Sequence, residues 1–482
     1  AEAHYIQTET TTQVATDISI NNLAYNKQPL GNWEMSAVYL PKETGEHSID
    51  GFVMLNGEEI MSMNGSYLSA SDKNDKDHIT ADVNLHHLPL KIANAFIPDN
   101  MAKLQGDLDG AISVEGSTSQ PVLNGQLGMD SVIVNIPQAS LNLRFDDRPL
   151  KIENSRLIFE RFNIFTKGKT PFSIDGYVDM TDMAAMDINL KMQAHNFELI
   201  NAKRTKESLV HGKLYVDVNA MLKGRPDALT MRGNMNILGN SDFTYVLKDS
   251  PLTVEDRLNE TVTFVDFSDT THIEKPNMPV MSLGGMDILM TLHIDEAVQA
   301  RVDLNDNGSN YMLLEGGGDL SFQYQPDGNM LLNGRYSLMS GEMKYEMPII
   351  PLKTFYIQDG SYIEWTGNLM NPNLNIKASE RVRASVSSDG GESTRMVNFD
   401  VGVNLTNRLE NLGFTFTLEA PDDGTMQNEL ASKSAEEKNK LAVTMLVTGV
   451  YMGDSSAGTK GFDTNSMLNS FLQSEINKVA GS

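Results

Sequence analysis

Apolar and polar residues alternate along most of the chain with a period of two. Apolar side chains stand at every second position, and Asp, Asn, Lys, Thr and Gln mostly fill the positions between them. Successive side chains of a β-strand point to opposite faces, so this period predicts strands with one apolar and one polar face. The clearest runs lie at residues 141–145, 186–192, 214–220, 286–294, 397–405 and 412–418. The pattern predicts an all-β fold.

Short segments rich in Gly, Asp and Asn separate these runs and predict tight turns between antiparallel strands. They are Asp175-Gly176, Pro326-Asp327-Gly328-Asn329, Asn333-Gly334, Asp359-Gly360 and Asp422-Asp423-Gly424. No segment before about residue 426 has a helical period of convincing length. We therefore predict one continuous antiparallel β-region over residues 1–425.

The pattern changes over residues 426–482, which we predict to be a helical or mixed segment. Residues 428–447 are rich in Glu, Lys, Ala and Leu, and Glu436 and Lys440 stand at i, i+4 spacing. Residues 465–480 carry a helical apolar stripe that includes Leu468 and Phe471. We expect two helices that cover the end of the sheet; the alternative is a helix that docks a partner.

The β-region also repeats. Gly106, Gly212 and Gly318 lie 106 residues apart (212 − 106 and 318 − 212), and each opens a strand. A Pro-containing turn and a second Gly follow each of them, at Pro121 and Gly125, Pro226 and Gly233, and Pro326 and Gly334. This repetition predicts a structure that grows by adding units rather than a set of separate globules.

Composition limits the possible partners. The chain has 482 residues, with 38 Lys and Arg against 64 Asp and Glu, and a formal net charge of −26. Nucleic acid is therefore not an expected partner, because its binding depends on Lys and Arg. We interpret the acidic residues as the solvated face of a one-sided sheet. The chain has no Cys, which excludes disulfides and thiolate chemistry, and its 28 Met indicate an adaptable apolar face.

No group of residues specifies a reaction or a cofactor. Residues 453–461 contain a Gly-rich stretch, but its order does not fit a phosphate-binding loop. Residues 303–308 begin like a calcium loop, but position 314 is Leu where the bidentate acid is required. His86 and His87 are adjacent on a strand and are expected to point to opposite faces. Acid pairs such as Asp107/Asp109 look like a solvated strand face. We therefore expect no enzyme activity, no metal and no cofactor.

The apolar face must be covered or used. A one-sided sheet can pack as a sandwich, close as a barrel or solenoid, or fold lengthwise into a trough. The apolar side chains would fill a closed core in the first cases, whereas a trough would offer them to acyl chains. The alternation alone leaves these alternatives open.

Several segments resemble the AsmA/TamB family. They are Gly106–Leu127, with its G-D-L-x-G-x-I-x-V-x-G pattern, Asn333–Tyr345, Phe355–Ala378, Asn439–Gly449 and Ser474–Asn477. The stretch from Gly360 to Ala378 carries the most specific similarity, which is to the C-terminal domain of TamB-type proteins. The resemblance spans roughly residues 85–480.

This resemblance implies a long antiparallel sheet folded lengthwise into a trough with an apolar interior, a β-taco. It also implies the periplasm and the cell envelope as the location. The family's partners are phospholipid acyl chains, a BamA/TamA-type outer-membrane barrel, and the inner membrane through an N-terminal anchor. We expect the chain to be a piece of a longer protein, because that anchor is absent from it.

The resulting hypothesis is a non-enzymatic conduit that passes phospholipid between the two membranes and supports outer-membrane protein assembly. The alternative is a chaperone whose sheet edge templates the strands of a barrel protein; an enzyme acting on glycans is a more distant one. A charge in mid-trough, such as Val216→Arg, is expected to block passage while the chain stays folded. The candidate lipid-contacting residues are Leu108, Ile112, Val114, Ile188, Leu190, Leu214, Val216, Val218, Ile288, Met290, Leu292, Phe322, Val401, Val403, Phe414 and Phe416.

Overall fold

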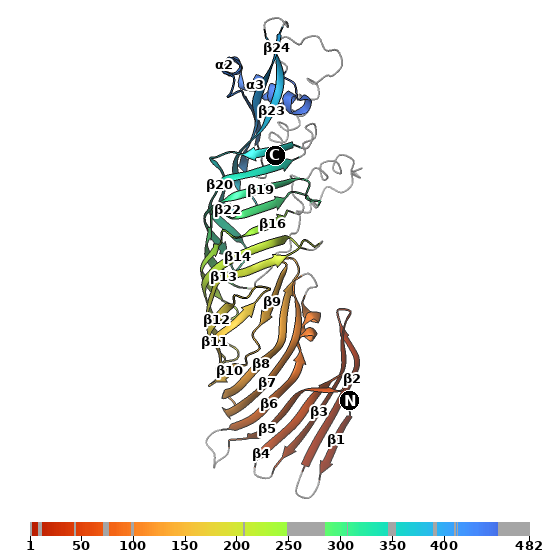
Figure 1. Ribbon diagram of the computed structural model, residues 1–482. Coiled ribbons are helices and arrows are strands. Elements are labelled where there is room, and N and C mark those ends of the chain that lie inside the picture. The colour runs from red at the N-terminus through yellow and green to blue at the C-terminus, as the bar shows by residue number, and fades with distance from the viewer. Residues whose placement is uncertain are drawn as a thin grey trace, which may run out of the picture. The chain divides into compact units, whose positions relative to one another are not determined.

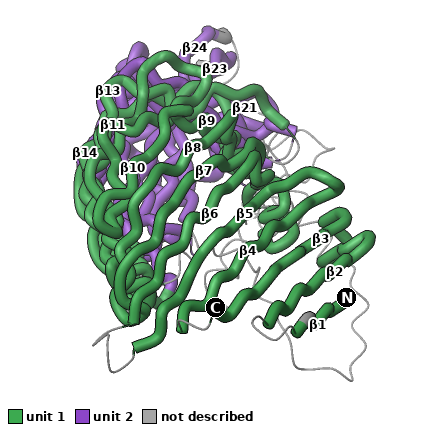
Figure 2. Tube along the Cα trace, turned by 90° about the horizontal axis from the view of Figure 1, so that it is seen from below, with its two compact units in different colours: residues 1–235, 283–290, 324–327 green, residues 236–282, 291–323, 328–482 purple. Residues whose placement is uncertain are grey.

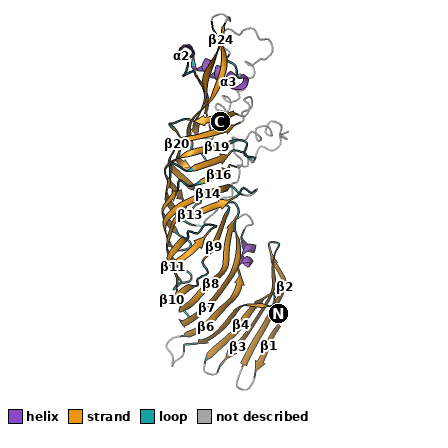
Figure 3. Ribbon diagram, viewed as in Figure 1, coloured by secondary structure: helices purple, strands orange, loops and turns teal. Residues whose placement is uncertain are grey.

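A computed structural model gives the fold (Figure 1). It describes residues 2–7, 12–42, 45–70, 77–97, 101–205, 208–247, 285–305, 307–345, 353–388, 393–408, 411 and 413–451. Within these residues the chain forms one mixed sheet of 25 strands, two α-helices and one 3₁₀-helix (Figure 3). The prediction of an all-β fold with helices near residue 426 is confirmed.

The strands and helices have the following bounds. The first fourteen strands are β1 (Glu2–Gln7), β2 (Thr12–Tyr25), β3 (Gln28–Pro41), β4 (Glu46–Leu55), β5 (Glu58–Leu68), β6 (His78–Pro89), β7 (Lys103–Ser117), β8 (Gln120–Ile136), β9 (Leu141–Phe145), β10 (Leu150–Glu153), β11 (Arg156–Phe165), β12 (Phe172–Asp179), β13 (Asp187–Ala202) and β14 (Val210–Gly224). They are followed by β15 (Thr230–Ile237), β16 (Asp242–Val246), β17 (Asp287–Ile294), β18 (Gln299–Asp303), β19 (Tyr311–Tyr324), β20 (Met330–Tyr345), β21 (Lys353–Ile357), β22 (Ser361–Asn368), β23 (Asn373–Ser388), β24 (Ser393–Arg408) and β25 (Gly413–Glu419). The helices are η1 (Leu90–Phe96), α2 (Gly424–Ser432) and α3 (Ala435–Thr448).

The chain divides into two compact units (Figure 2). Unit 1 comprises residues 1–235, 283–290 and 324–327, and unit 2 comprises residues 236–282, 291–323 and 328–482.

Unit 1 is built mainly as an antiparallel meander. Each strand from β1 to β8 pairs with the next strand in the sequence. Strand β8 then pairs with both β9 and β10, both of these pair with β11, and the meander continues through β12, β13 and β14. Sequential pairing of this kind follows from the short turns between alternating runs.

The prediction of a wholly antiparallel region is wrong in unit 2, where β16 and β18 pair in parallel and make the sheet mixed. Strand β20 pairs with both β21 and β22, and both pair with β23, which is followed by β24 and β25. Helix α3 contacts β24 and β25, and α2 contacts β25. The helices thus lie against the last strands of the sheet.

Two of the turn predictions are wrong. Asp175-Gly176 lies inside β12 and Asn333-Gly334 lies inside β20. Both Gly residues have a φ of +131°, and a Cβ on Gly176 would stand 2.1 Å from the carbonyl oxygen of Asn189. Glycine is required here by the close approach of a neighbouring strand rather than by a turn. The turns at 326–329, 359–360 and 422–424 are confirmed.

The helical segment begins close to the predicted residue but is divided. Residues 428–447 fall into α2 and α3, because Lys433 and Ser434 leave the helical conformation. Ser434 starts α3 with a capping box, in which its hydroxyl accepts from the Glu437 N–H and the Glu437 carboxylate accepts from the Ser434 N–H. The helix expected at 465–480 and the Gly-rich stretch at 453–461 lie outside the described residues.

The glycines of the predicted repeat lie on strands. Gly106 and Gly212 stand near the start of β7 and β14, but Gly318 lies in the middle of β19 and Pro121 lies inside β8 rather than in a turn, so these two details of the prediction are wrong. The repeat as a structural unit and the boundary at residue 425 stay predictions.

Gly125→Ala is expected to lower the free energy of unfolding by about 2 kcal/mol or more. Gly125 has a φ of +149°, and a Cβ there would stand 2.1 Å from the carbonyl oxygen of Ala111. Gly128→Ala in the same strand is the control, because its Cβ would meet nothing closer than 3.7 Å. Urea unfolding of both variants checks this; equal midpoints would show that the close approach does not matter.

Candidate functional site

The strand registers of unit 1 gather apolar side chains on one surface. Residues that are paired across antiparallel strands share a face of the sheet, so the pairings trace rows of side chains. We call the surface formed by these rows the apolar face. From β3 to β8 its rows are Tyr39, Ile49, Gly65, Ala81, Val114 and Leu123; Ala37, Gly51, Met63, Val83, Ile112 and Gly125; and Met35, Val53, Met61, Leu85, Gly110 and Leu127.

The opposite side of the same strands is mostly polar. The row between the first two rows of the apolar face runs through Val38, Asp50, Asn64, Asp82, Ser113 and Asn124. The Asn64 amide donates a hydrogen bond to the Asp50 carboxylate across β4 and β5. The sheet here is therefore one-sided, as the alternation predicts.

The apolar face continues from β10 to β14. Rows there include Ile152, Leu157, Val178 and Ile188; Phe159, Gly176, Leu190 and Leu222; and Phe162, Ile174, Met192 and Ala220. Gly125 of β8 pairs with Ile152, which joins these rows to those of the preceding strands. Side chains more than 100 residues apart in the sequence thus share one surface of unit 1.

Eight of the sequence candidates lie on this face of unit 1. They are Leu108, Ile112 and Val114 on β7, Ile188 and Leu190 on β13, and Leu214, Val216 and Val218 on β14. The registers bring them together although they come from three separate segments. Their contact with lipid stays a prediction.

Exposure differs along the apolar face. Side chains of the first strands are open to solvent, with Met35 37% and Ile49 38% exposed. On β14, Val216 is only 1% exposed and pairs with the buried Phe197, whose ring meets that of Phe172 edge-on. The accessible part of the apolar face is therefore on β2–β5, whereas β13 and β14 carry packed side chains.

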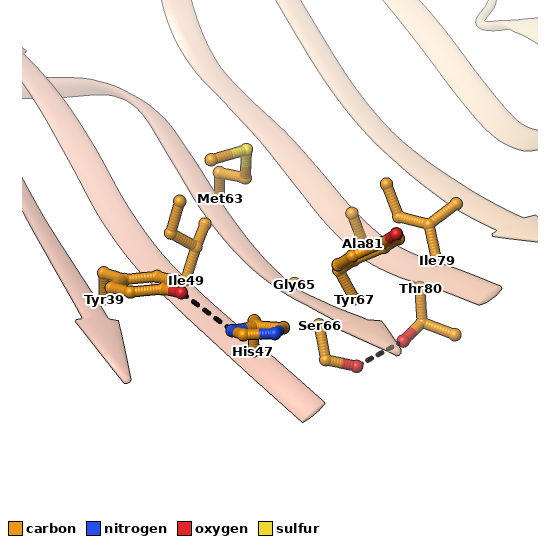
Figure 4. Close-up of a pocket in the computed structure, with 10 residues that line it drawn as sticks. All are labelled: Tyr39, His47, Ile49, Met63, Gly65, Ser66, Tyr67, Ile79, Thr80 and Ala81. Carbon is orange, nitrogen blue, oxygen red and sulfur yellow. Dashed lines mark hydrogen bonds between the residues drawn. The ribbon is translucent and has the colours of Figure 1, made fainter. Parts of the chain in front are cut away.

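A hollow of about 440 Å³ lies on the accessible part (Figure 4). Its lining includes Ile49, Met63 and Ala81, and Gly65 has no side chain to fill it. At one end the Tyr39 hydroxyl and His47 Nδ1 share a hydrogen bond of 2.7 Å. The Tyr39, His47 and Tyr67 rings stack in series, with centroids 5.8 and 6.0 Å apart. An apolar hollow with a polar end can hold a hydrocarbon chain that carries a polar group.

Unit 2 has a closed core instead. Val401 and Val403 are fully buried, and Phe416 and Leu418 of β25 are their cross-strand partners. The other buried members of the cluster include Ala442, Val443, Met445 and Leu446 of α3 and Met426 and Leu430 of α2. The core candidates Val401, Val403 and Phe416 therefore contact protein in this structure.

The remaining candidates are mixed in exposure. Ile288 and Met290 of β17 are buried, whereas Leu292, Phe322 and Phe414 are half-buried. Like the others, they stay predictions as lipid contacts.

Hydrogen bonds and ring contacts hold the helices against the last strands. The Asn439 side chain accepts a hydrogen bond from the Phe416 N–H at 2.8 Å, and the Gln427 side chain accepts one from the Ala420 N–H at 2.7 Å. The Tyr451 ring, just after α3, stacks on Phe399 with centroids 5.1 Å apart. These contacts satisfy edge groups of β25 and close the core over its apolar face.

Tyr336 is a polar exception within this core. Its hydroxyl is buried without a hydrogen-bond partner among the described residues. Burial, together with the nearby Glu315 carboxylate, raises the pKa of Tyr336 to about 12. The phenol therefore stays neutral and serves as a packed ring.

The candidates for metal or catalytic chemistry do not come together. His86 and His87 lie at a bulge of β6, where His86 faces Glu59 and His87 bonds Asp109. Asp303 at the calcium-like sequence is paired with Arg301 at 2.7 Å. Across the described part of the chain, no group of three or more His, Asp or Glu is placed to hold a metal ion. In the same residues, no helix has the length and apolar character to span a bilayer.

Sequence reasoning missed the most accessible part of the apolar face. Met35, Ile49 and Met63 are absent from the candidates, although Ile49 and Met63 line the hollow and Met35 lies on the same face. The signal was present as alternation in Trp33-x-Met35-x-Ala37-x-Tyr39 and Met61-x-Met63. Glycines at positions 51 and 65 weakened it, because they interrupt the apolar runs.

The comparison with known families gives one match. A family model described as the TamB C-terminal domain matches residues 160–482, more than half of the chain, and this confirms the resemblance. A comparison with curated proteins finds no match.

Val216→Arg is now expected to destabilise unit 1 rather than leave it folded. A buried guanidinium without a partner costs about 3 kcal/mol or more, whereas Met35→Arg at an exposed position should cost less than about 1 kcal/mol. Urea unfolding of the two variants measures the difference. Equal stability of the two variants would contradict the packing described for β14.

Proposed function

The chain belongs to the TamB C-terminal domain family, and on this premise we propose that it is a hydrophobic conduit for phospholipid acyl chains in the Gram-negative envelope. It would act in the periplasm without catalysis, passing lipid between the inner and the outer membrane.

The observation that supports this proposal is the accessible apolar face of unit 1. Rows of Met, Val, Ile and Leu side chains from successive strands form one surface, and the hollow beside Ile49 lies within it. Each methylene moved from water onto such a surface gains about 0.8 kcal/mol. Because neighbouring rows are chemically alike, a chain can move from one to the next without losing specific bonds.

The charge distribution supports the same function. The net charge of −26 is compatible with acyl binding, because polar and acidic side chains such as Asp50 and Asp82 lie on the face opposite the apolar rows. An acyl chain can lie on the apolar face while its headgroup stays in water.

Further parts of the proposal concern partners. A BamA/TamA-type outer-membrane barrel would receive the lipid, and an inner-membrane anchor would place the protein between the membranes. Support of outer-membrane protein assembly is the second role proposed with them. If the chain acts instead as a chaperone, its sheet edge would pair with strands of a client.

Ile49→Arg is expected to reduce phospholipid that co-purifies with the chain by about tenfold, because a charge on the apolar face opposes acyl contact. Phe52→Arg is the matched control. Phe52 is 39% exposed on the same strand but on the opposite face, paired with Ser36 and Ser62. Native mass spectrometry after expression in a Gram-negative host measures the bound lipid.

Equal loss of lipid in both variants, or no phospholipid on the parent chain, would count against the conduit. Crosslinks from the sheet edge to client peptides in the absence of bound lipid would favour the chaperone.

A further inference from the structure

The sheet that forms the wall of unit 1 has a break, an interruption of its hydrogen-bond ladder, where β8 changes partner from β10 to β9 (Figure 1). The pairing of β8 with β10 ends at Leu127 and Leu150, and its pairing with β9 begins at Ile133 and Arg144. Residues 128–132, all described, therefore have no ladder partner on that side.

The next strand, β11, has a matching gap. It pairs with β10 up to Ile158 and with β9 from Ile164, which leaves residues 159–163 without a ladder partner toward β9 and β10. A bulge interrupts its pairing with β12 between Phe159 and Phe162, and Arg161 has a φ of +46°. On β8, Ser131 has a φ of +52°. Both strands thus depart from regular geometry at the same level of the sheet.

The segment that crosses the break is Asp146-Asp147-Arg148-Pro149, which we call the strap. Pro149 has no N–H and cannot donate to a ladder, and residues before a proline have restricted backbone angles. The sequence therefore prevents the strap from continuing β9 into β10 as one strand.

The strap is fastened on one side only. The Arg148 guanidinium donates to the Asp146 carboxylate and to the Arg161 carbonyl, each at 2.6 Å. The Asp146 N–H donates to the Asn163 carbonyl at 2.9 Å. Among the described residues, no hydrogen bond joins the strap to residues 128–132 of β8.

A hollow flanks the strap on each side. One, of about 590 Å³, lies toward β8 and includes Gly128 and Met129 in its lining. The other, of about 260 Å³, lies toward β11 and includes Ile158 and Phe162. Pro149 lines both, so the strap is the partition between them.

On the apolar face, packed side chains close the break. Val132, Leu150 and Phe162 are buried there, and the Phe162 ring lies 6.1 Å from that of Phe145. These side chains pack without hydrogen bonds, so they can separate without leaving polar groups unpaired.

A second split strand, formed by β21 and β22 in unit 2, is likewise fastened to the strand that follows it, β23. Between β21 and β22 the Ser361 hydroxyl donates to the Gln358 carbonyl and accepts from the Lys377 N–H, at 2.7 and 3.0 Å. The Gln358 N–H also donates to the Lys377 carbonyl at 2.7 Å. On the other side, toward β20, residues 339–341 have no ladder partner, so both breaks are open toward the preceding strand and the one beside the strap is longer.

We propose that the break is a lateral gate in the wall of unit 1. The strap turns about its bonds to β11, Leu150 moves away from Val132 of β8, and a passage opens between the polar and the apolar face. Apolar side chains of Met129, Val132 and Leu150 and the acidic Asp130 and Asp147 border this side. An acyl chain that carries a polar headgroup is the cargo that fits them, and this identification rests on the proposed function. The opening itself does not.

Cysteine labelling tests the gate, because the parent chain has no Cys. Leu150→Cys reports on the gate, and Val216→Cys, also buried but on β14, three strands along the sheet from β11, is the control. A water-soluble maleimide should label the Leu150→Cys variant faster than the Val216→Cys variant. The rate for the gate variant should barely change at low urea, as for a local opening, while the rate for the control variant should rise steeply.

Adding Arg148→Ala releases the strap and should raise labelling of the gate variant by about tenfold without changing labelling of the control variant. Equal rates for the two thiols with the same urea dependence, or an equal rise of both with Arg148→Ala, would overturn the gate. The assay contains no lipid, so its result is independent of whether Ile49→Arg reduces bound phospholipid.

Discussion

Everything in this protein depends on the register of its antiparallel hydrogen-bond ladders. Alternating residues give a single strand one apolar side. A continuous apolar surface arises only when neighbouring strands pair in a register that puts these sides on the same face of the sheet. A slip of one residue between β4 and β5 would place Asn64 beside Ile49 and expose Met63 on the polar side. The continuous pairing from β1 to β8 therefore turns a local pattern into a surface that can hold hydrocarbon.

What covers that surface then decides its use. In unit 2, Val401 and Val403 are completely buried in a core that includes α2 and α3, and hydrogen bonds from the Phe416 and Ala420 N–H groups to Asn439 and Gln427 hold the helices in place. In unit 1, Ile49 and Met35 stand on strands of the same kind, yet they remain open to solvent. Water contact with apolar side chains is costly, so an exposed row of this length is a surface that gains free energy from an acyl chain.

Interruptions of the hydrogen-bond ladder decide where the sheet can open. A split strand costs backbone hydrogen bonds, and the two described here are both fastened to the following strand but leave unpaired stretches of different length on the preceding one. Beside β21 and β22, residues 339–341 of β20 have no ladder partner, whereas on the side of the strap, where Pro149 cannot donate, five residues of β8, 128–132, have none. The strap is fastened to one neighbour by Arg148 and Asp146. A wall of this kind resists opening everywhere except where its own sequence prevents pairing.

By itself the sequence determined the strands, the one-sided character of the sheet, the helical segment near residue 426, and the resemblance that the family match confirms. These depend on residues near one another in the chain, such as the alternation at 397–405 or the helix formers of 435–448. Only the tertiary structure decided that Asn333-Gly334 lies in a strand, that Met63 belongs to the accessible face, and that Val216 is buried. Those outcomes depend on the distance to a neighbouring strand or on what packs above a side chain. Ile49 and Val401 stand in strands with the same alternation. The alternation therefore does not tell that helices cover Val401 while Ile49 stays exposed.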